Sequence, residues 1–189
     1  MQRRRSDAPA NRLQLIEAAR RVFAEKGISA EVKDIAAEAG VGIGTFYRNF
    51  PRKDDLILAL LEEVDEFMEA AFEQAAQGDR KGVERIRFVI LRFFETEQRY
   101  GWLAEALWSG QLPKEWLVRD RDDQKRELLE QFLQQGVDEG DLRKDFNAPL
   151  AIAMMMGAIV FRSRLNLDLG PEETADTVLQ LMLQGIGQR

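Results

Sequence analysis

The chain has 189 residues, of which 45% are hydrophobic and 32% charged, a balance typical of folded globular proteins. It contains no cysteine and no histidine, which excludes disulfides, thiolate nucleophiles, the usual zinc sites and imidazole acid–base catalysis. The net charge is −6, but residues 1–53 carry 11 Lys and Arg against 6 Asp and Glu, a net charge of +5, and residues 54–189 carry −11. A small basic segment therefore precedes a large acidic one.

The sequence predicts no membrane segment. The longest apolar run, residues 150–161, has 12 residues and ends at Arg162, whereas a spanning helix needs about 20. The basic N-terminal residues are followed by charged and polar side chains, not by the apolar run of a signal peptide. We therefore expect a cytoplasmic protein that contacts no membrane.

Apolar residues recur at helical spacing along the chain, and no convincing strand pattern is present, so the predicted fold class is all-α with about nine helices. The first helix ends at Gly27. Two short helices follow, which meet at a turn at Gly40 and end before Pro51. A long helix begins at Lys53, and five more are predicted at 83–98, 101–108, 118–139, 149–165 and 172–185.

The two short helices have the features of a helix-turn-helix. Ala36 is small where the second helix crosses, Gly40 suits the left-handed turn, and Val41 fills the angle between the helices. Phe46 and Phe50 are four residues apart, so both anchor the second helix from inside. The second helix is therefore predicted to be the recognition helix of a DNA-binding domain.

The opposite face of the recognition helix offers hydroxyls, a guanidinium, an amide and apolar atoms to the major groove of DNA. The residues on this face are Ile43, Gly44, Thr45, Tyr47, Arg48 and Asn49. Gly42 and Gly44 allow a close approach of the backbone to DNA. Lys53 lies at a helix N-terminus, where its charge and the helix dipole both favour a phosphate.

This segment resembles the N-terminal signature of the TetR family of repressors. The resemblance covers about residues 12–60, and its motifs are Asp34-Ile35-Ala36, Ala39-Gly40-Val41-Gly42-Ile43-Gly44-Thr45-Phe46-Tyr47-Arg48-Asn49-Phe50 and Lys53-Asp54-Asp55-Leu56. It implies a homodimer that binds a palindromic operator in double-stranded DNA and releases it when a small-molecule effector enters the C-terminal domain.

By position, the resemblance implies phosphate contacts at Thr45, Tyr47 and Lys53. The positions that it implies can reach base edges are Lys33, Ile43, Arg48 and Asn49. Two positions depart from the family pattern, because Glu31 and Arg52 stand where helix-capping residues are common. We therefore expect weak N-terminal caps on the second and fourth helices.

We expect a three-helix DNA-binding domain at residues 8–55, joined by a long helix to an effector-binding and dimerisation domain at 56–189. The helices at 149–165 and 172–186 are apolar on more than one face, which favours an antiparallel four-helix contact with a second copy over packing within one chain. The dimer is expected to hold its recognition helices about 34 Å apart, one turn of DNA. Candidates to line the effector pocket are Phe67, Phe88, Trp102 and Met155, although most such residues fill cores.

Other functions have weaker support in the sequence. No pattern brings two carboxylates together in an apolar setting, which disfavours an enzyme with catalytic residues. The glycines at 40–44 follow a helix and lack the lysine of a nucleotide-binding loop, so we expect no cofactor. The acidic cluster Asp120, Asp122 and Asp123 has no regular ligand spacing, so we expect no metal site either. A regulator whose C-terminal domain recruits a protein partner and binds no small molecule stays open. A closed apolar cavity of a few hundred Å³ would distinguish the two.

Overall fold

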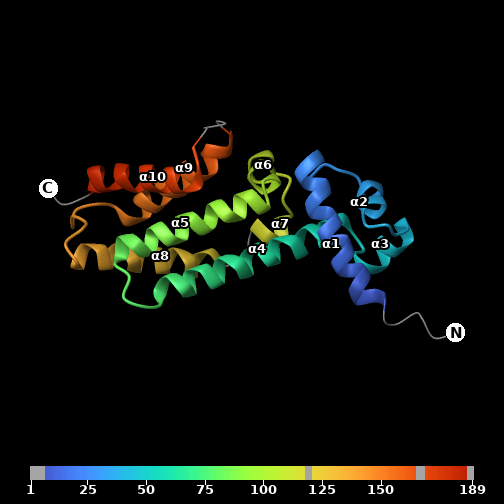
Figure 1. The fold of residues 1–189 in the computed structure, drawn as a ribbon, viewed down its shortest axis with the longest axis horizontal. Coiled ribbons are helices and arrows are strands. Elements are labelled where there is room, and N and C mark those ends of the chain that lie inside the picture. The colour runs from blue at the N-terminus through green and yellow to red at the C-terminus, as the bar shows by residue number, and fades with distance from the viewer. Residues whose placement is uncertain (1–6, 118–120, 165–168, 187–189) are drawn as a thin grey trace. The chain divides into compact units, whose positions relative to one another are not determined.

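The computed structural model describes residues 7–117, 121–164 and 169–186. These residues form ten α-helices and no β-strand, so the predicted all-α fold is confirmed (Figure 1). The additional helix is the four-residue α7, where the sequence pattern predicts none. The helices are α1 (Asp7–Lys26), α2 (Val32–Glu38), α3 (Ile43–Asn49), α4 (Lys53–Ala76), α5 (Gly82–Arg99), α6 (Trp102–Ser109), α7 (Lys114–Leu117), α8 (Arg121–Asp138), α9 (Ala148–Arg164) and α10 (Pro171–Ile186). Among the described helices, none has the length and hydropathy needed to cross a membrane.

The chain divides into two compact units, each with its own hydrophobic core. The first unit runs to Asp65 and resumes at Tyr100–Val118, and the second unit consists of Glu66–Arg99 and Arg119–Arg189. This division differs from the boundary expected at residue 55, because the first turns of α4 and the later segment with α6 and α7 both pack in the first unit.

The core of the first unit is built on one face of α1. Leu15, Ala19 and Phe23 recur every four residues on that face and are at most 1% exposed. They belong to one apolar cluster with Ile35 of α2 and Phe46 of α3, both fully buried. Burial of this stripe brings α1, α2 and α3 together, as Figure 1 shows.

The segment that follows α5 also belongs to the first unit. Tyr100 and Trp102 are each 3% exposed and lie in its core, together with Ala106 of α6. The Trp102 ring packs on Phe23 of α1 with 5.3 Å between the ring centroids. Aromatic contacts of this kind stabilise the packing beyond their buried area. The DNA-binding half expected from the sequence is therefore completed by residues far along the chain.

The core of the second unit lies between α5, α8, α9, α10 and the last turns of α4. Arg85 of α5 is buried, and its guanidinium donates hydrogen bonds to the carbonyl oxygens of Ala75 (2.7 Å), Gly78 (2.9 Å) and Arg80 (2.9 Å). These three carbonyls end α4 and form the loop to α5. One buried cation thus satisfies backbone acceptors that the end of a helix leaves without partners.

The start of α5 lies very close to α8. A Cβ atom built on Gly82 would be 2.3 Å from the Phe132 carbonyl oxygen and 2.5 Å from the Gly136 amide nitrogen. Both of these atoms belong to the α8 backbone, so neither can move aside as a flexible side chain would. The contact between α5 and α8 therefore requires glycine at position 82.

We predict that Gly82→Ala lowers the free energy of unfolding by about 1–3 kcal/mol, the cost of overpacking a core. The matched control is Gly44→Ala, because a Cβ at that helical position meets nothing within 4 Å. Gly44→Ala should raise the free energy of unfolding, by up to about 1 kcal/mol. Chemical denaturation followed by circular dichroism measures both variants. Equal stability of the two would contradict the close approach.

Candidate nucleic-acid interface

The turn between α2 and α3 has the backbone conformation that the sequence predicts. Gly40 has a φ of 66°, in the left-handed region that glycine adopts without steric cost. Its N–H donates to the Ala37 carbonyl (3.0 Å), and the N–H of Val41 donates to the Ala36 carbonyl (2.9 Å). Val41 packs partly buried against the core. These contacts fix the direction in which α3 leaves α2.

The inner face of α3 is anchored by two phenylalanines. Phe46 is fully buried and Phe50 is 1% exposed, with 6.0 Å between the ring centroids. A helix of only 7 residues is not stable in water without such packing. The two rings therefore hold α3 in the first unit and decide which of its faces points outward.

The outer face of α3 is open. Ile43 and Tyr47 are 50% and 51% exposed, although both carry large apolar groups. A Cβ built on Gly42 or Gly44 would meet no atom within 4 Å, so the backbone of the first turn is also accessible. Exposed apolar groups of this kind are typical of a binding surface.

The polar side chains of α3 hydrogen-bond along the helix itself. Arg48 donates from Nη2 to the Thr45 hydroxyl oxygen (2.8 Å) and from Nε to the Gly44 carbonyl (3.1 Å). Asn49 donates from Nδ2 to the Thr45 carbonyl (2.8 Å). Arg48 is exposed and Asn49 is partly buried. Both side chains thus lie on the helix surface with donor groups left over for another molecule.

The two predicted lysine contacts already have partners within the first unit. Lys33 Nζ lies 2.7 Å from a Glu31 carboxylate oxygen, and this hydrogen bond raises the pKa of Lys33. The Lys53 ammonium donates to the Ile28 carbonyl oxygen and lies 5.7 Å from the centroid of the Phe23 ring. Partial burial lowers the pKa of Lys53 by desolvation. Lys53 is therefore tied to the loop after α1 in this structure.

The structure differs from the expectation of weak caps on α2 and α4. The N–H of Glu31 donates to a carboxylate oxygen of Asp34 (3.3 Å), and the N–H of Arg52 donates to a carboxylate oxygen of Asp55 (2.8 Å). In each case an acid three residues into the helix supplies the acceptor, as in a capping box. The sequence signal for these caps lies at Asp34 and Asp55, three residues after the cap residues themselves.

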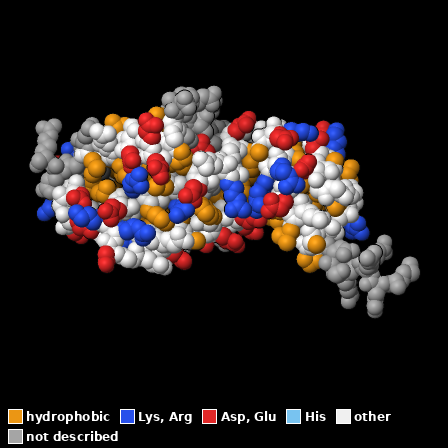
Figure 2. All heavy atoms as spheres, in the orientation of Figure 1, with side chains coloured by type: hydrophobic (Ala, Val, Ile, Leu, Met, Phe, Trp, Pro, Cys, Tyr) orange, Lys and Arg blue, Asp and Glu red, His pale blue; other side chains and the backbone are white. Residues whose placement is uncertain are grey.

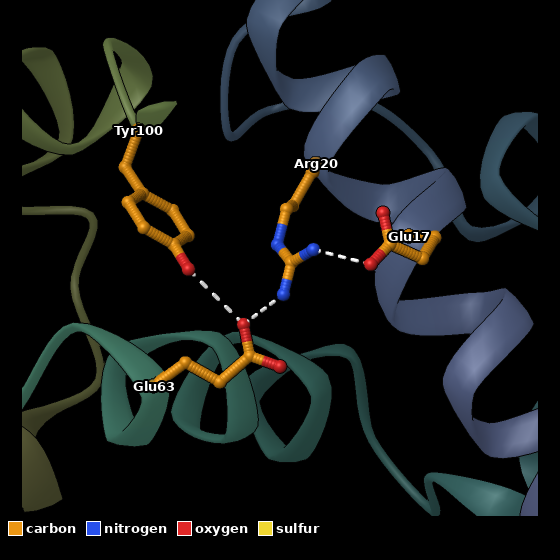
Figure 3. Close-up of polar contacts among 4 residues, drawn as sticks. All are labelled: Glu17, Arg20, Glu63 and Tyr100. Carbon is orange, nitrogen blue, oxygen red and sulfur yellow. Dashed lines mark hydrogen bonds and ion pairs between the residues drawn. The ribbon is translucent and has the colours of Figure 1, made fainter. Parts of the chain in front are cut away.

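A polar cluster joins α1 to the rest of the first unit (Figure 3). The Arg20 guanidinium donates to Glu63 of α4 and to Glu17, and the Tyr100 hydroxyl donates to the same Glu63 oxygen (3.1 Å). Burial acts to lower the pKa of Arg20, but the hydrogen bonds to the two carboxylates and the negative charge of Glu63 raise it overall. The cluster ties α1, α4 and the segment after α5 together.

The four candidates for an effector pocket do not share one core. Trp102 lies in the core of the first unit, whereas Met155 lies in the core of the second unit and Phe67 and Phe88, partly buried, pack against that second core. Met155 lines a cavity of about 200 Å³ between α9 and α10, which Phe67 and Phe88 do not line. The described lining of this cavity is Ala151, Met154, Met155, Ala158, Val178, Leu181 and Met182.

Known proteins resemble this chain in sequence and in fold. The sequence model described as bacterial regulatory proteins, tetR family, matches residues 15–60. The HTH-type transcriptional repressor KstR2 of Mycobacterium tuberculosis is 26% identical over 186 residues, covering 94% of this chain and 93% of the relative. The solved structure of the ketosteroid transcriptional regulator KstR2 of the same organism has a TM-score of 0.74 at 25% identity and covers 94% of this chain and 95% of that one. Bacillus subtilis FadR in complex with stearoyl-CoA has the same fold, with a TM-score of 0.72 at 24% identity and coverage of 92% and 98%.

We predict that Asp55→Asn destabilises the first unit at neutral pH and makes its stability less dependent on pH in the acid range. The hydrogen bond from the Arg52 side chain lowers the pKa of Asp55 below its ordinary value of 3.8. A carboxyl with a depressed pKa in the folded state stabilises the fold above its unfolded pKa and loses this effect as the pH falls through the folded pKa. The gap between wild type and Asp55→Asn should therefore close below about pH 4.

Thermal denaturation between pH 3 and pH 7 checks this prediction. The control is Asp54→Asn, since Asp54 is exposed and accepts no hydrogen bond from the described residues. Its melting temperature should stay closer to that of wild type at every pH. A constant gap between wild type and Asp55→Asn across the whole range would rule out the proposed titration.

Proposed function

Because this chain belongs to the TetR family of bacterial regulatory proteins, we propose that it is a transcriptional repressor that binds a palindromic operator as a homodimer and releases it when a small molecule binds. The observation that carries this proposal is α3, whose inner face is fixed by Phe46 and Phe50 while its outer face is exposed. The helix lies within the residues that match the family's sequence model. The major groove of DNA accepts an α-helix presented in this way.

Each exposed group of the interface has a role in this proposal. The exposed Ile43 side chain suits contact with a thymine methyl group, and the guanidinium of Arg48 suits the acceptors of guanine. Lys53 exchanges the Ile28 carbonyl for a phosphate, since a charged acceptor binds an ammonium more strongly than a neutral one does. The proposed base contacts are Lys33, Ile43, Arg48 and Asn49. The proposed phosphate contacts are Thr45, Tyr47 and Lys53. Gly42 and Gly44 allow the backbone at the start of α3 to come close to the duplex.

The second copy of the chain docks on α9 and α10 in this proposal. Leu150, Met154 and Leu181 are 58%, 67% and 65% exposed, which is a large apolar exposure for side chains of one helix pair. The 200 Å³ cavity between the two helices opens beside Met154 and Leu181 and has an apolar lining. A second copy of the same face would cover these side chains by two-fold symmetry. Burial of these apolar side chains in both copies favours association.

The effector binds in the second unit in this proposal. FadR, which shares the fold, is solved in complex with stearoyl-CoA, so a protein of this fold can bind such a molecule. Phe67, Phe88 and Met155 remain the proposed lining residues, because Met155 lies in the core of this unit and the two phenylalanines pack against that core. Trp102 packs on Phe23 in the first unit, and we assign it a packing role.

Selection of bound duplexes from random DNA tests the proposal. Wild type should enrich a two-fold symmetric sequence with half-sites about one helical turn apart. Arg48→Ala should relax the preference at particular base pairs, because it removes a group that reads base edges. Lys53→Ala should weaken binding to every sequence and reduce the salt dependence. No enrichment by wild type would refute the proposed function, and identical effects of the two variants would refute this division of roles.

We predict that Met154→Asp, alone or with Leu181→Asp, converts the dimer to a monomer, because it places a charge in the apolar contact between two copies. Sedimentation equilibrium measures the mass, and affinity for the selected duplex should fall with it. Leu13→Asp is the control, since Leu13 is 63% exposed on α1 in the first unit. This control should stay dimeric. A wild-type chain that is monomeric at micromolar concentration would refute the assignment.

A further inference from the structure

Most of the positive charges that the structure describes in the first unit lie beside its own carboxylates. Figure 2 shows Lys and Arg side chains lying among Asp and Glu side chains over the visible surface. Each of five cations lies within ion-pair distance of an acid, and the pairs are Arg20 with Glu63, Arg21 with Glu38, Lys26 with Asp34, Lys33 with Glu31, and Arg52 with Asp55. A cation held in this way must leave its acid before it can bind a phosphate. The net charge of +5 of residues 1–53 therefore overstates the charge that is free to bind DNA.

Arg12 of α1 is an exception. It is exposed, and none of the carboxylates that the structure describes lies within ion-pair distance of it. Its guanidinium lies over the Phe50 ring, 4.4 Å from the ring centroid. Phe50 directly follows α3 and packs on Phe46 in the core. The stacking therefore places the Arg12 cation beside the C-terminal end of α3.

The stacked arrangement leaves the guanidinium ready for an anion. The Arg12 guanidinium makes no hydrogen bond to the residues that the structure describes, so its N–H donors stay available for a bidentate contact with phosphate. Arg48 also has no carboxylate partner among the described residues, but it donates hydrogen bonds to Gly44 and Thr45. A buried ring beneath the cation also restricts a long side chain before binding, which reduces the entropy lost on association.

We propose that Arg12 binds a phosphate of the DNA backbone next to the surface of α3 and that the Phe50 ring positions its guanidinium for this contact. The assignment rests on the proposed function, because it supposes that α3 enters the major groove. It adds a contact from α1 to those that the family resemblance implies. Each half-site then has a phosphate contact whose geometry depends on the same aromatic residue that anchors α3.

The test is the salt dependence of binding by the full-length chain. Arg12→Gln, Arg12→Lys and the control Arg21→Gln are titrated against the duplex selected by wild type and against an unrelated duplex. Arg21→Gln removes the same charge from an exposed position of the same helix, but its side chain is paired with Glu38 at 2.6 Å. Thermal melting of each variant shows whether the fold is intact.

For Arg12→Gln, the plot of log affinity against log salt should be shallower by about 0.9 per protomer, or about 1.8 per dimer. A rise from about 50 to 200 mM salt should then weaken wild type roughly tenfold more than the variant. Both duplexes should show this change, since phosphate contacts carry no sequence information. Arg12→Lys should keep the slope of wild type but bind severalfold more weakly, because an ammonium cannot form the bidentate contact. Arg21→Gln should keep both slope and affinity.

Three results would overturn the assignment. An unchanged slope in Arg12→Gln, with wild type binding normally, removes Arg12 from the interface and leaves the proposed function standing. Equal changes in Arg12→Gln and Arg21→Gln mean that net charge alone is responsible. A lower melting temperature in Arg12→Gln with an unchanged slope means that the stacking on Phe50 serves only the fold. Failure of wild type to bind any duplex would instead refute the proposed function, and this inference with it.

Discussion

The position of α3 depends on the burial of Phe46 and Phe50. The helix has only seven residues, one of which is Gly44 in its first turn, so it has little stability of its own. Burial of each phenylalanine contributes about 1.5–3 kcal/mol, which is enough to hold one face of a two-turn helix against the first unit. Because the inner face is fixed, the outer face with Ile43, Tyr47 and Arg48 is fixed as well. The interface is thus a consequence of core packing and not of the exposed residues themselves.

Charge imposes a second constraint, since the chain as a whole is acidic and DNA is a polyanion. The first 53 residues have a net positive charge, and most of the cations that the structure describes there are paired with acids. In the proposed interface, attraction to DNA depends on a few groups at particular positions, among them Arg12 and Arg48, and not on a broad basic surface. Joining two first units through α9 and α10 would double this small number of contacts, so dimerisation and DNA binding depend on each other in this account.

Local patterns predicted the local structure well, because helical spacing, Gly40 and the pair of phenylalanines act within a few residues of one another. Contacts between distant residues could not be predicted in the same way. Nothing in the spacing shows that Tyr100 and Trp102 complete the core of the first unit, since their partners lie in α1 and α4. Two further contacts could not be predicted because they also join residues far apart in the sequence. They are the hydrogen bond from Lys53 to Ile28 and the contact of Arg12 with the Phe50 ring. The exposed face of α3 was predictable, whereas the partners of its neighbouring cations were not.

The central claim is that the outer face of α3 is the surface that enters DNA. Hydrogen–deuterium exchange of the full-length chain, with and without saturating selected duplex, tests it most directly. Amides 43–49 should exchange more slowly when DNA is bound, because the duplex excludes water from the exposed helix, while amides of α8 should exchange at an unchanged rate. Bound DNA with no protection at 43–49 would contradict the account, because DNA would then bind elsewhere on the chain.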